Sequence, residues 1–195
     1  MKIFGIKVFY TILELFRIVK CSRFSFSLKT KRKHDKVLII MNGTSIMEAL
    51  KKIDADIEKF DTICVNSFVT TDLFLKIRPR YYLMIDPTYW LDSVEPEVEI
   101  TRESIYSDLI SKVDWEMYLI VPAYPKKIAF AEKVALMNKN IKLLKINITS
   151  ISLGFKTIRE FIYKINLGMP HPQNILVAGI FFAINMHYKE ACLIG

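Results

Sequence analysis

Six short apolar runs, separated by stretches with helical spacing, constrain the fold of this chain more than any other feature. The runs span residues 36–41, 62–65, 81–85, 117–121, 141–146 and 191–195. They lack the polar alternation of a strand with one face in water, so we interpret them as strands covered on both faces. The sequence therefore predicts a sheet buried inside the molecule.

Helical patterns fill the intervals between these strands. We expect helices over residues 45–53, 70–77, 101–113, 126–138, 155–165 and 173–187, and a loop over the acidic stretch 88–100. Strands that alternate with helices indicate an α/β fold, here a Rossmann-like, mostly parallel sheet flanked by helices. Ligands of such sheets bind where the strands end. We therefore look for site residues in the loops that follow the predicted strands.

An amphipathic, basic N-terminal helix precedes the sheet. Of the 28 Lys/Arg and 20 Asp/Glu residues, ten basic and two acidic ones lie in residues 1–36, so this segment carries the whole net charge of +8. A groove that follows a nucleic-acid backbone needs positive charge across the folded domain. We therefore expect no nucleic-acid partner, and divide the chain into a basic arm (1–35) and a Rossmann-like domain (36–195).

The arm is rich in Phe and Ile as well as in Lys and Arg. Charges at Lys7, Glu14 and Arg17 interrupt it, so it has no run of about 18 uncharged residues that could span a bilayer, and no signal-peptide cleavage site follows. Two interpretations stay open: a helix bound to an anionic membrane surface through residues 1–36, or a helix packed on the domain. We favour the first.

The cysteines, Cys21, Cys64 and Cys192, are widely spaced and form no C-x-x-C pair or Cys/His cluster. This spacing indicates neither a zinc site nor a disulfide framework. Reduced thiols without a cleavable signal predict a cytoplasmic protein, peripherally associated with the inner membrane.

The strongest local motif is Asn42-Gly43-Thr44-Ser45, which follows the first strand and opens a helix. Gly43 permits a tight turn and a close backbone approach, and the helix N-terminus offers free N–H groups to a phosphate. An ordinary strand–turn–helix connection has the same pattern, and the chain shows neither G-x-G-x-x-G nor a Walker A loop here. Asn66 and Asp86 mark the next two strand ends, where both are also common turn residues.

These strand ends resemble the bacterial family 42 sialyltransferases. Asn42–Ile46, Val65–Phe68 and Ile85–Pro87 are similar to that family's G-N-G-P-S-L, C-N-x-F and N-P motifs, and NMHYKEACLIG (185–195) is similar to its A-L-G-Y-K-E-I-Y-L-x-G segment. The related motility-accessory and pterin-diphosphokinase-like proteins share this core. The resemblance covers about residues 36–195 and implies a Rossmann-like domain of surface-polysaccharide biosynthesis.

The resemblance implies a site for a nucleotide-activated sugar, in this family a CMP-sugar. The nucleotide-binding positions would be Asn42, Gly43, Thr44, Ser45, Asn66 and Gly195, and the sugar-contacting positions Asp86, Gln173 and Asn174. It further implies inverting transfer to a glycan or glycolipid acceptor, with no metal and no cofactor besides the donor substrate. A homo-oligomer stays open.

Three departures from the family pattern qualify these expectations. Met41, Thr44 and Asp86 stand where the family has glycine, proline and asparagine. A carboxylate at position 86 would repel an anionic donor sugar, so we expect a donor other than sialic acid. The family's histidine base lies beyond the position that matches Gly195, so we expect a truncated chain that lacks this base and is inactive alone.

Among the histidines, only His171 is considered for acid–base chemistry, because it lies between two prolines before a helix, in a loop that could face the cleft. His34 is expected to be solvated, and His187 to end a helix. The triplet Asp54-Ala55-Asp56 has the metal-binding pattern of many sugar transferases. It ends a predicted helix, away from the strand ends, so no metal site is predicted.

Three functions stay open on the sequence alone. The first is a glycosyltransferase that uses a nucleotide-activated donor to build a surface glycan. The second is a diphosphokinase-like phosphoryl transfer that needs ATP and Mg²⁺. The third is a non-catalytic nucleotide-binding scaffold of polysaccharide assembly.

Overall fold

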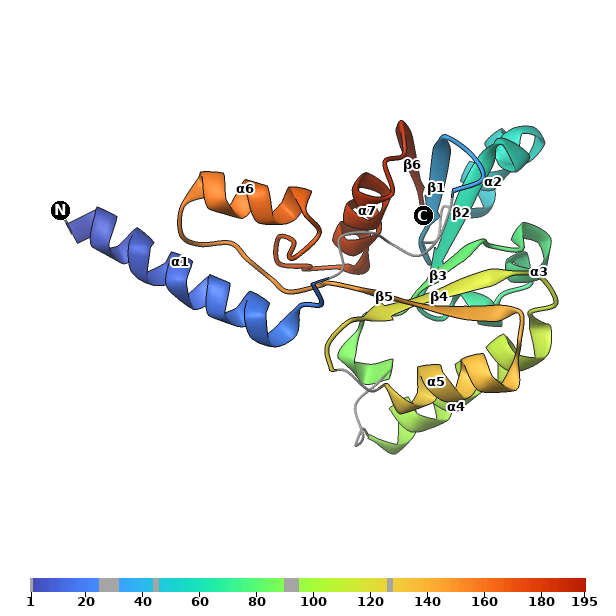
Figure 1. Cartoon of the computed structure of the whole chain (residues 1–195). Helices are drawn as coiled ribbons and strands as arrows, with labels where there is room; N and C mark the ends of the chain where they lie inside the picture. Colours follow the sequence, from blue (N-terminus) through green and yellow to red (C-terminus); the bar gives the residue numbers. More distant parts are fainter. Residues whose placement is uncertain (1, 25–31, 44–45, 90–94, 126–127) are drawn as a thin grey trace.

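The computed structural model describes residues 2–24, 32–43, 46–89, 95–125 and 128–195. Within them a six-stranded, all-parallel sheet forms in the order β5-β4-β3-β2-β1-β6 (Figure 1). Its strands are β1 (Lys36–Ile40), β2 (Phe60–Val65), β3 (Tyr81–Leu83), β4 (Met117–Pro122), β5 (Ile141–Ile146) and β6 (Glu190–Ile194). Each predicted apolar run forms a strand, which confirms the Rossmann-like α/β fold.

The helices fill the intervals in the predicted order. They are α1 (Lys2–Cys21), α2 (Ile46–Ile53), α3 (Leu73–Ile77), α4 (Pro96–Lys112), α5 (Ala129–Met137), α6 (Lys156–Lys164) and α7 (Ile175–Asn185). Among the residues described, three short 3-10 helices lie between them: η1 (Asp54–Lys59), η2 (Phe68–Thr70) and η3 (Pro87–Tyr89).

The prediction of a loop over 88–100 is wrong at its C-terminal end, because α4 already begins at Pro96. Proline suits the first helical position, where its missing N–H leaves no bond unmade. Glu97 and Glu99 then place negative charge in the first turn, which the helix dipole favours. These local signals outweigh the missing apolar periodicity.

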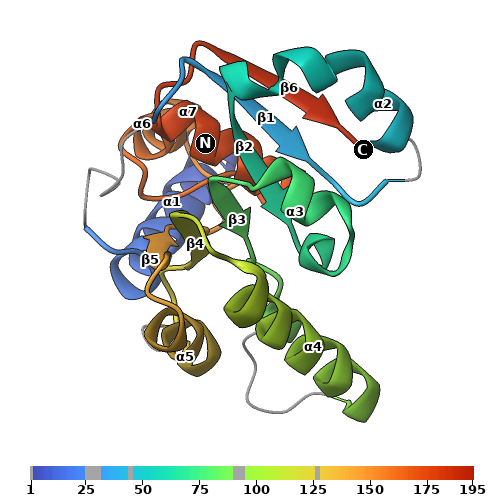
Figure 2. The same cartoon turned by 90° about the vertical axis from the view of Figure 1, so that its right-hand side faces the viewer.

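Successive residues of a strand point to opposite faces of the sheet, and in β1, β2, β3 and β4 both faces are buried. The prediction of two-sided burial is wrong for residues 191–195, because β6 lies at the edge of the sheet and is largely exposed. In β1, Leu38 and Ile40 pack in a core with residues of α3, α4 and α5, whereas Val37 and Ile39 pack in a second core with α7. Figure 2 shows the strands between these helices. Continuous apolar runs are what this two-sided burial requires.

The chain reverses direction across the sheet once. It runs from β1 outward to β5, and then returns through α7 to β6, which pairs with the other side of β1. Because crossovers between parallel strands are right-handed, the reversal places α7 on the face opposite to α2–α5. The carboxyl ends of β1 and β6 form the topological switch point, where open α/β sheets bind ligands.

Helix α1 lies with α6 in a lobe beside the sheet (Figure 1). Its buried side is largely polar: Thr11 and Glu14 are each 7% exposed, and Ile18 packs on Ile151 and Ile162. Its exposed side is apolar, with Ile6, Phe9, Ile12, Leu13, Phe16 and Val19 between 44% and 74% exposed. This is the reverse of the usual burial of an amphipathic surface helix.

Polar contacts hold α1 in this orientation. Glu14 Oε1 accepts the backbone N–H groups of Ser152 (2.8 Å) and Leu153 (2.6 Å), and Thr11 Oγ1 accepts that of Phe155 (3.0 Å). Gly154 has φ +74°, and a Cβ there would lie 2.5 Å from Thr11 Oγ1. The described residues include no helix of sufficient length and apolarity to cross a bilayer.

Candidate functional site

The predicted strand-end residues follow neighbouring strands at one edge of the sheet. The strand order β3-β2-β1-β6 brings Asp86, Asn66, Asn42 and Gly195 to successive carboxyl ends. Asn42 Nδ2 donates to Ser67 Oγ (2.9 Å), which joins the loops after β1 and β2. The sequence therefore predicted correctly that these residues gather at a common edge.

Gly43 and Gly195 touch each other at the switch point. A Cβ on Gly43 would lie 2.1 Å from the carbonyl carbon of Gly195, so any side chain at position 43 forces the two loop ends apart. The close backbone approach expected at Gly43 is therefore an approach to this chain's own backbone. Thr44 and Ser45, the other two residues of the motif, lie outside the described residues.

A cavity of about 640 Å³ opens beside this edge, on the side of α7. Asn66 and Asp86 line it from the ends of β2 and β3, and His171, Gln173 and Asn174 line it from the entry to α7. Five of the predicted site residues thus surround one space. Asn42, Gly43 and Gly195 are not among its lining residues and lie further along the edge.

Several lining residues were not singled out from the sequence. Tyr124 comes from the loop after β4, a position that the strand-end rule does indicate, and Thr149 and Ser150 follow β5. Arg17 and Cys21 come from α1, more than forty residues before Asn66 in the chain. No local pattern signals their place, because it depends on how α1 docks.

Asn66 lines the cavity and has a buried acceptor without a partner. Its backbone is left-handed (φ 52°), a conformation that asparagine tolerates, and its backbone N–H donates to Leu83 O (3.3 Å). Its carbonyl accepts the hydroxyl of Tyr82. Its side-chain Oδ1 is buried without a hydrogen-bond partner in the structure. Such an atom costs about 1–3 kcal/mol, which a ligand N–H or O–H group could recover.

Asp86 has a structural role as well as a place in the cavity wall. Its Oδ1 accepts the backbone N–H (2.9 Å) and the hydroxyl (2.7 Å) of Thr88, which forms a turn at the start of η3. This is the ordinary role of an Asp that precedes a short helix. The turn fixes the carboxylate at the cavity wall.

Helix α7 directs its N-terminus at the cavity. Asn174 is its N-cap, with Oδ1 accepting the Val177 N–H at 3.3 Å, and Gln173 N–H donates to His171 O (2.9 Å). The free N–H groups of a helix N-terminus carry a partial positive charge that attracts anions. The cavity therefore combines an anion-favouring end, an orphan acceptor and one carboxylate.

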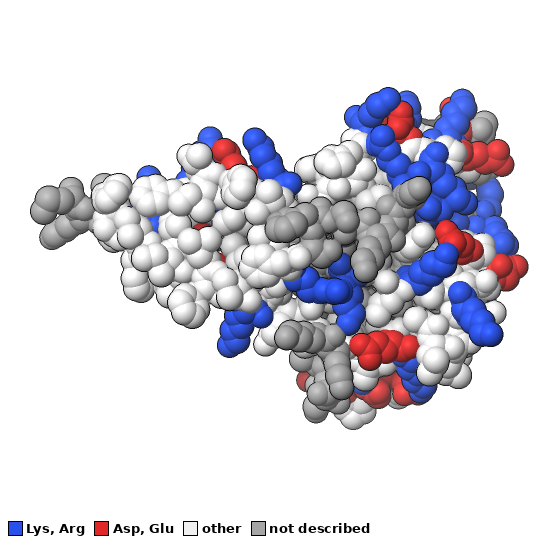
Figure 3. Space-filling view, in the orientation of Figure 1, with Lys and Arg blue, Asp and Glu red and all other residues white. Residues whose placement is uncertain are grey.

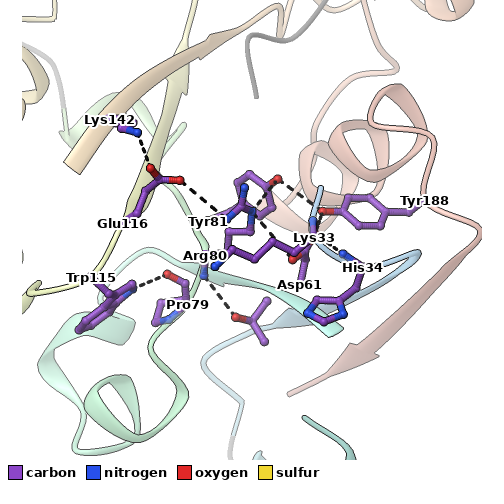
Figure 4. Close-up of polar contacts among 11 residues, drawn as sticks. Lys33, His34, Asp61, Pro79, Arg80, Tyr81, Trp115, Glu116, Lys142 and Tyr188 are labelled. Atoms are coloured by element: carbon purple, nitrogen blue, oxygen red, sulfur yellow. Dashed lines mark hydrogen bonds and ion pairs between the residues drawn. The ribbon is translucent and has the colours of Figure 1, made fainter. Parts of the chain in front are cut away.

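The opposite, amino-terminal edge of the sheet holds a buried polar network (Figure 4). Asp61 Oδ2 accepts the Tyr188 hydroxyl (2.5 Å) and the backbone N–H of Lys33 (2.8 Å), while Arg80 Nε lies 3.9 Å from Asp61 Oδ1. Burial, and then the hydrogen bond to Asp61, raises the pKa of Tyr188 far above its ordinary value. The network joins the segment before β1 to β2, β3 and the α7–β6 turn.

The remaining histidines and the D-x-D triplet also lie away from the cavity. His34 precedes β1 and His187 follows α7, so both lie near the amino-terminal edge. Asp56 pairs with Lys59 within η1, before β2 begins. His171 remains the histidine that lines the cavity.

Comparisons with known proteins give one informative match. No protein-family model and no curated protein matches the sequence. Among solved structures, the chain is similar to the MAf glycosyltransferase from Magnetospirillum magneticum AMB-1, with a TM-score of 0.52 and 12% identity. The match covers 95% of this chain and 27% of that one. This likeness shows a shared fold, and the chain spans about a quarter of the length of that glycosyltransferase.

Proposed function

We propose that this chain is a donor-binding domain of a glycosyltransferase, with a nucleotide-activated sugar in the cavity beside β2 and β3. The cavity itself carries the proposal: it gathers Asn66, Asp86, His171, Gln173 and Asn174 at the edge where such sheets bind ligands. The similar fold of a solved glycosyltransferase supports it.

Each group of the donor has a chemically matched partner in the cavity. The phosphate lies at the N-terminus of α7, where free N–H groups meet it. Asn66 Oδ1 accepts a hydrogen bond from an amino or hydroxyl group of the nucleoside. Asp86 meets sugar hydroxyls, and its charge favours a neutral sugar over an anionic one. On the strand-end resemblance, the donor is a CMP-sugar.

The proposed chemistry is transfer with inversion, and His171 is its candidate base. An acceptor hydroxyl oxygen attacks the anomeric carbon, the bond from that carbon to the phosphate oxygen breaks, and His171 takes the hydroxyl proton. The resemblance places the family's own base outside this chain. If His171 takes its place, release of CMP from a CMP-sugar, tested with and without acceptor, should be measurable and should fall by about 10²–10⁴ in His171→Gln. No release from the unmodified chain would exclude His171 as a sufficient base.

The donor site is tested by a thermal-shift screen against CMP, CDP, UDP, GDP and ATP, each with and without Mg²⁺. A ligand at 100 times its dissociation constant adds about 2.7 kcal/mol of stability. We expect a metal-independent shift with CMP that is lost in Asn66→Ala. It should persist in the matched control Asn140→Ala, which lies before β5 at the opposite edge.

Other outcomes of the screen would contradict the proposal in recognisable ways. A shift with ATP only when Mg²⁺ is present would indicate phosphoryl transfer. A CMP shift that survives in Asn66→Ala would place the nucleotide outside this cavity. Unchanged stability with all five nucleotides would favour a non-catalytic scaffold.

We further propose that α1 binds the surface of an anionic membrane, on the cytoplasmic side of the inner membrane. Figure 3 shows that the lobe around α1 and α6 is mostly uncharged, whereas charged side chains gather over the α/β body. The exposed apolar side chains of α1 are joined by Lys7, Arg17 and Lys20, all at the surface. Apolar and basic residues together favour an anionic interface.

Co-sedimentation with vesicles tests this attachment. The chain should pellet with phosphatidylglycerol vesicles more than with phosphatidylcholine vesicles, and Phe16→Ser should release it. Leu136→Ser is the matched control, since Leu136 is 81% exposed on α5. If the apolar face instead binds a second copy, Phe16→Ser will reduce the mass in sedimentation velocity and leave vesicle binding unchanged.

A further inference from the structure

Arg17 brings a positive charge from α1 to the wall of the cavity. Arg17 and Cys21, one helical turn apart, both line it. In the part of the chain that the structure describes, Arg17 makes no ion pair, while the nearby carboxylate of Glu14 accepts the Ser152 and Leu153 N–H groups. The guanidinium is therefore available to an anion in the cavity.

The position of Arg17 relative to the cavity is fixed by contacts at the end of α1. Ser22 Oγ lies 2.6 Å from Thr149 Oγ1 and donates to Leu167 O (2.7 Å). The backbone N–H of Arg23 donates to Asn147 Oδ1 (2.8 Å), and Asn147 Nδ2 donates back to Arg23 O (2.9 Å). Since Thr149 itself lines the cavity, this end of α1 is joined directly to the cavity wall.

An apolar stripe leads away from Arg17 along the same helix. Ile6, Tyr10 and Leu13 precede Arg17 at spacings of eleven, seven and four residues, which places all four on one face. All three are exposed, at 54%, 37% and 44%. Ile6 and Tyr10 lie beside Gly5 and Phe9 on an open part of the helix surface, where a Cβ on Gly5 would meet nothing within 4 Å.

A cation at the cavity and exposed apolar side chains therefore lie on one helix face, with Tyr10 about 10 Å and Ile6 about 17 Å from Arg17 along the axis at 1.5 Å per residue. A ligand that satisfies both has an anionic head and an apolar chain. Arginine binds phosphate through several N–H groups at once, and each buried methylene of the chain adds to the affinity.

We infer that α1 binds an amphiphile with a phosphate head group, placing the phosphate at Arg17 and the apolar chain along Leu13, Tyr10 and Ile6. The inference rests on the proposed function and names its acceptor class: a lipid with a phosphate, held at Arg17, and a hydroxyl group that attacks the donor sugar. The same lipid would then contact both the membrane-facing helix α1 and the donor cavity.

Isothermal titration of the full chain with dodecyl phosphate, below its micelle concentration, tests the inference. Inorganic phosphate and dodecyl glucoside serve as probes of the head and the chain alone. Dodecyl phosphate should bind at least tenfold more tightly than either. Arg17→Gln should weaken its binding tenfold or more, and Leu13→Ser should weaken it without changing the affinity for inorganic phosphate.

Lys156→Gln is the control, because it removes one positive charge from α6, in the same lobe, at an exposed position that does not line the cavity. Its affinity for dodecyl phosphate should stay within twofold. Equal losses in Arg17→Gln and Lys156→Gln would reduce the effect to general charge attraction and overturn the inference. Inorganic phosphate binding as tightly as dodecyl phosphate would assign Arg17 to the phosphate of the nucleotide instead.

The titration separates this inference from the proposed function. If the chain binds CMP but not dodecyl phosphate, the donor site is supported and the amphiphile site is contradicted. If the chain binds dodecyl phosphate through Arg17 but binds no nucleotide, the amphiphile site is supported and the glycosyltransferase proposal is contradicted.

Discussion

At the scale of single residues, several positions of the predicted site have structural roles that the sequence alone could not separate from binding. Gly43 is a glycine because the backbone of Gly195 occupies the space of a side chain. Asp86 closes a turn with Thr88, and Asn174 caps α7. Asn66 differs from these, since its buried Oδ1 has no hydrogen-bond partner in the structure. Asn66 is therefore the residue whose side chain has no structural role in these contacts and is best explained by ligand binding.

Gly43→Ala should destabilise the chain, because the new Cβ meets backbone atoms of Gly195 within 2.1–3.0 Å, so one of the two segments must shift. Overpacking of this kind costs about 1–3 kcal/mol, measured as a lower urea midpoint at an unchanged slope. Gly5→Ala is the control: its Cβ meets open space on α1, so it should stabilise the helix by up to about 1 kcal/mol. Equal stability of the two variants would contradict the contact between Gly43 and Gly195.

Because of Tyr188, the free energy of unfolding should decrease as the pH rises in the alkaline range. Burial and the bond to Asp61 raise the pKa of its hydroxyl above the ordinary value of 10.0, so the folded chain keeps this proton when the unfolded chain has lost it. This stabilisation is complete below pH 10 and is lost progressively as the pH rises above it. Burial raises the pKa of Tyr82 in the same direction.

Tyr188→Phe should lower the free energy of unfolding by about 1 kcal/mol at neutral pH, because it removes one hydrogen bond from Asp61. It should also weaken the loss of stability between about pH 8 and pH 10.5, measured by urea unfolding at both values. An unchanged pH dependence in the variant would contradict an un-ionised, buried Tyr188.

At the scale of elements, the strands could be predicted and the orientation of α1 could not. Two-sided burial demands continuous apolar runs, so the runs that form β1 to β4 can be recognised in the sequence. The run that forms β6 is equally apolar, although this edge strand is largely exposed. The partners of Thr11 and Glu14 lie about 140 residues later, at Ser152–Phe155, so no local pattern indicates them. Asn66 and Asp86 were found by the strand-end rule, whereas Arg17 reaches the cavity only through the docking of α1.

Glu14→Ala should loosen α1, because it leaves the N–H groups of Ser152 and Leu153 without their acceptor. Hydrogen bonds to a charged group contribute about 1.5–3 kcal/mol, so amide exchange at both residues should accelerate at least tenfold. Glu160→Ala on the exposed side of α6 should change neither rate, since Glu160 forms only a surface pair with Lys156 at 3.7 Å. Unchanged protection in Glu14→Ala would show that α1 is held by other contacts.

At the scale of the whole molecule, polar groups are divided between the two edges of the sheet. The amino-terminal edge closes around Asp61 with hydrogen bonds that fix the strands (Figure 4). The carboxyl edge opens beside α7 and is walled on one side by α1. A fold with this division holds its scaffold at one edge and presents a binding site at the other.

The most direct test of the donor site is an amide hydrogen-exchange map with and without saturating CMP. We predict added protection at Asn66 and at residues 173–177, whose backbone surrounds the cavity and the N-terminus of α7. Amides of Lys33 and His34, bound to Asp61 at the opposite edge, should exchange at unchanged rates. Protection confined to other segments, or none at saturating CMP, would contradict a nucleotide site in this cavity.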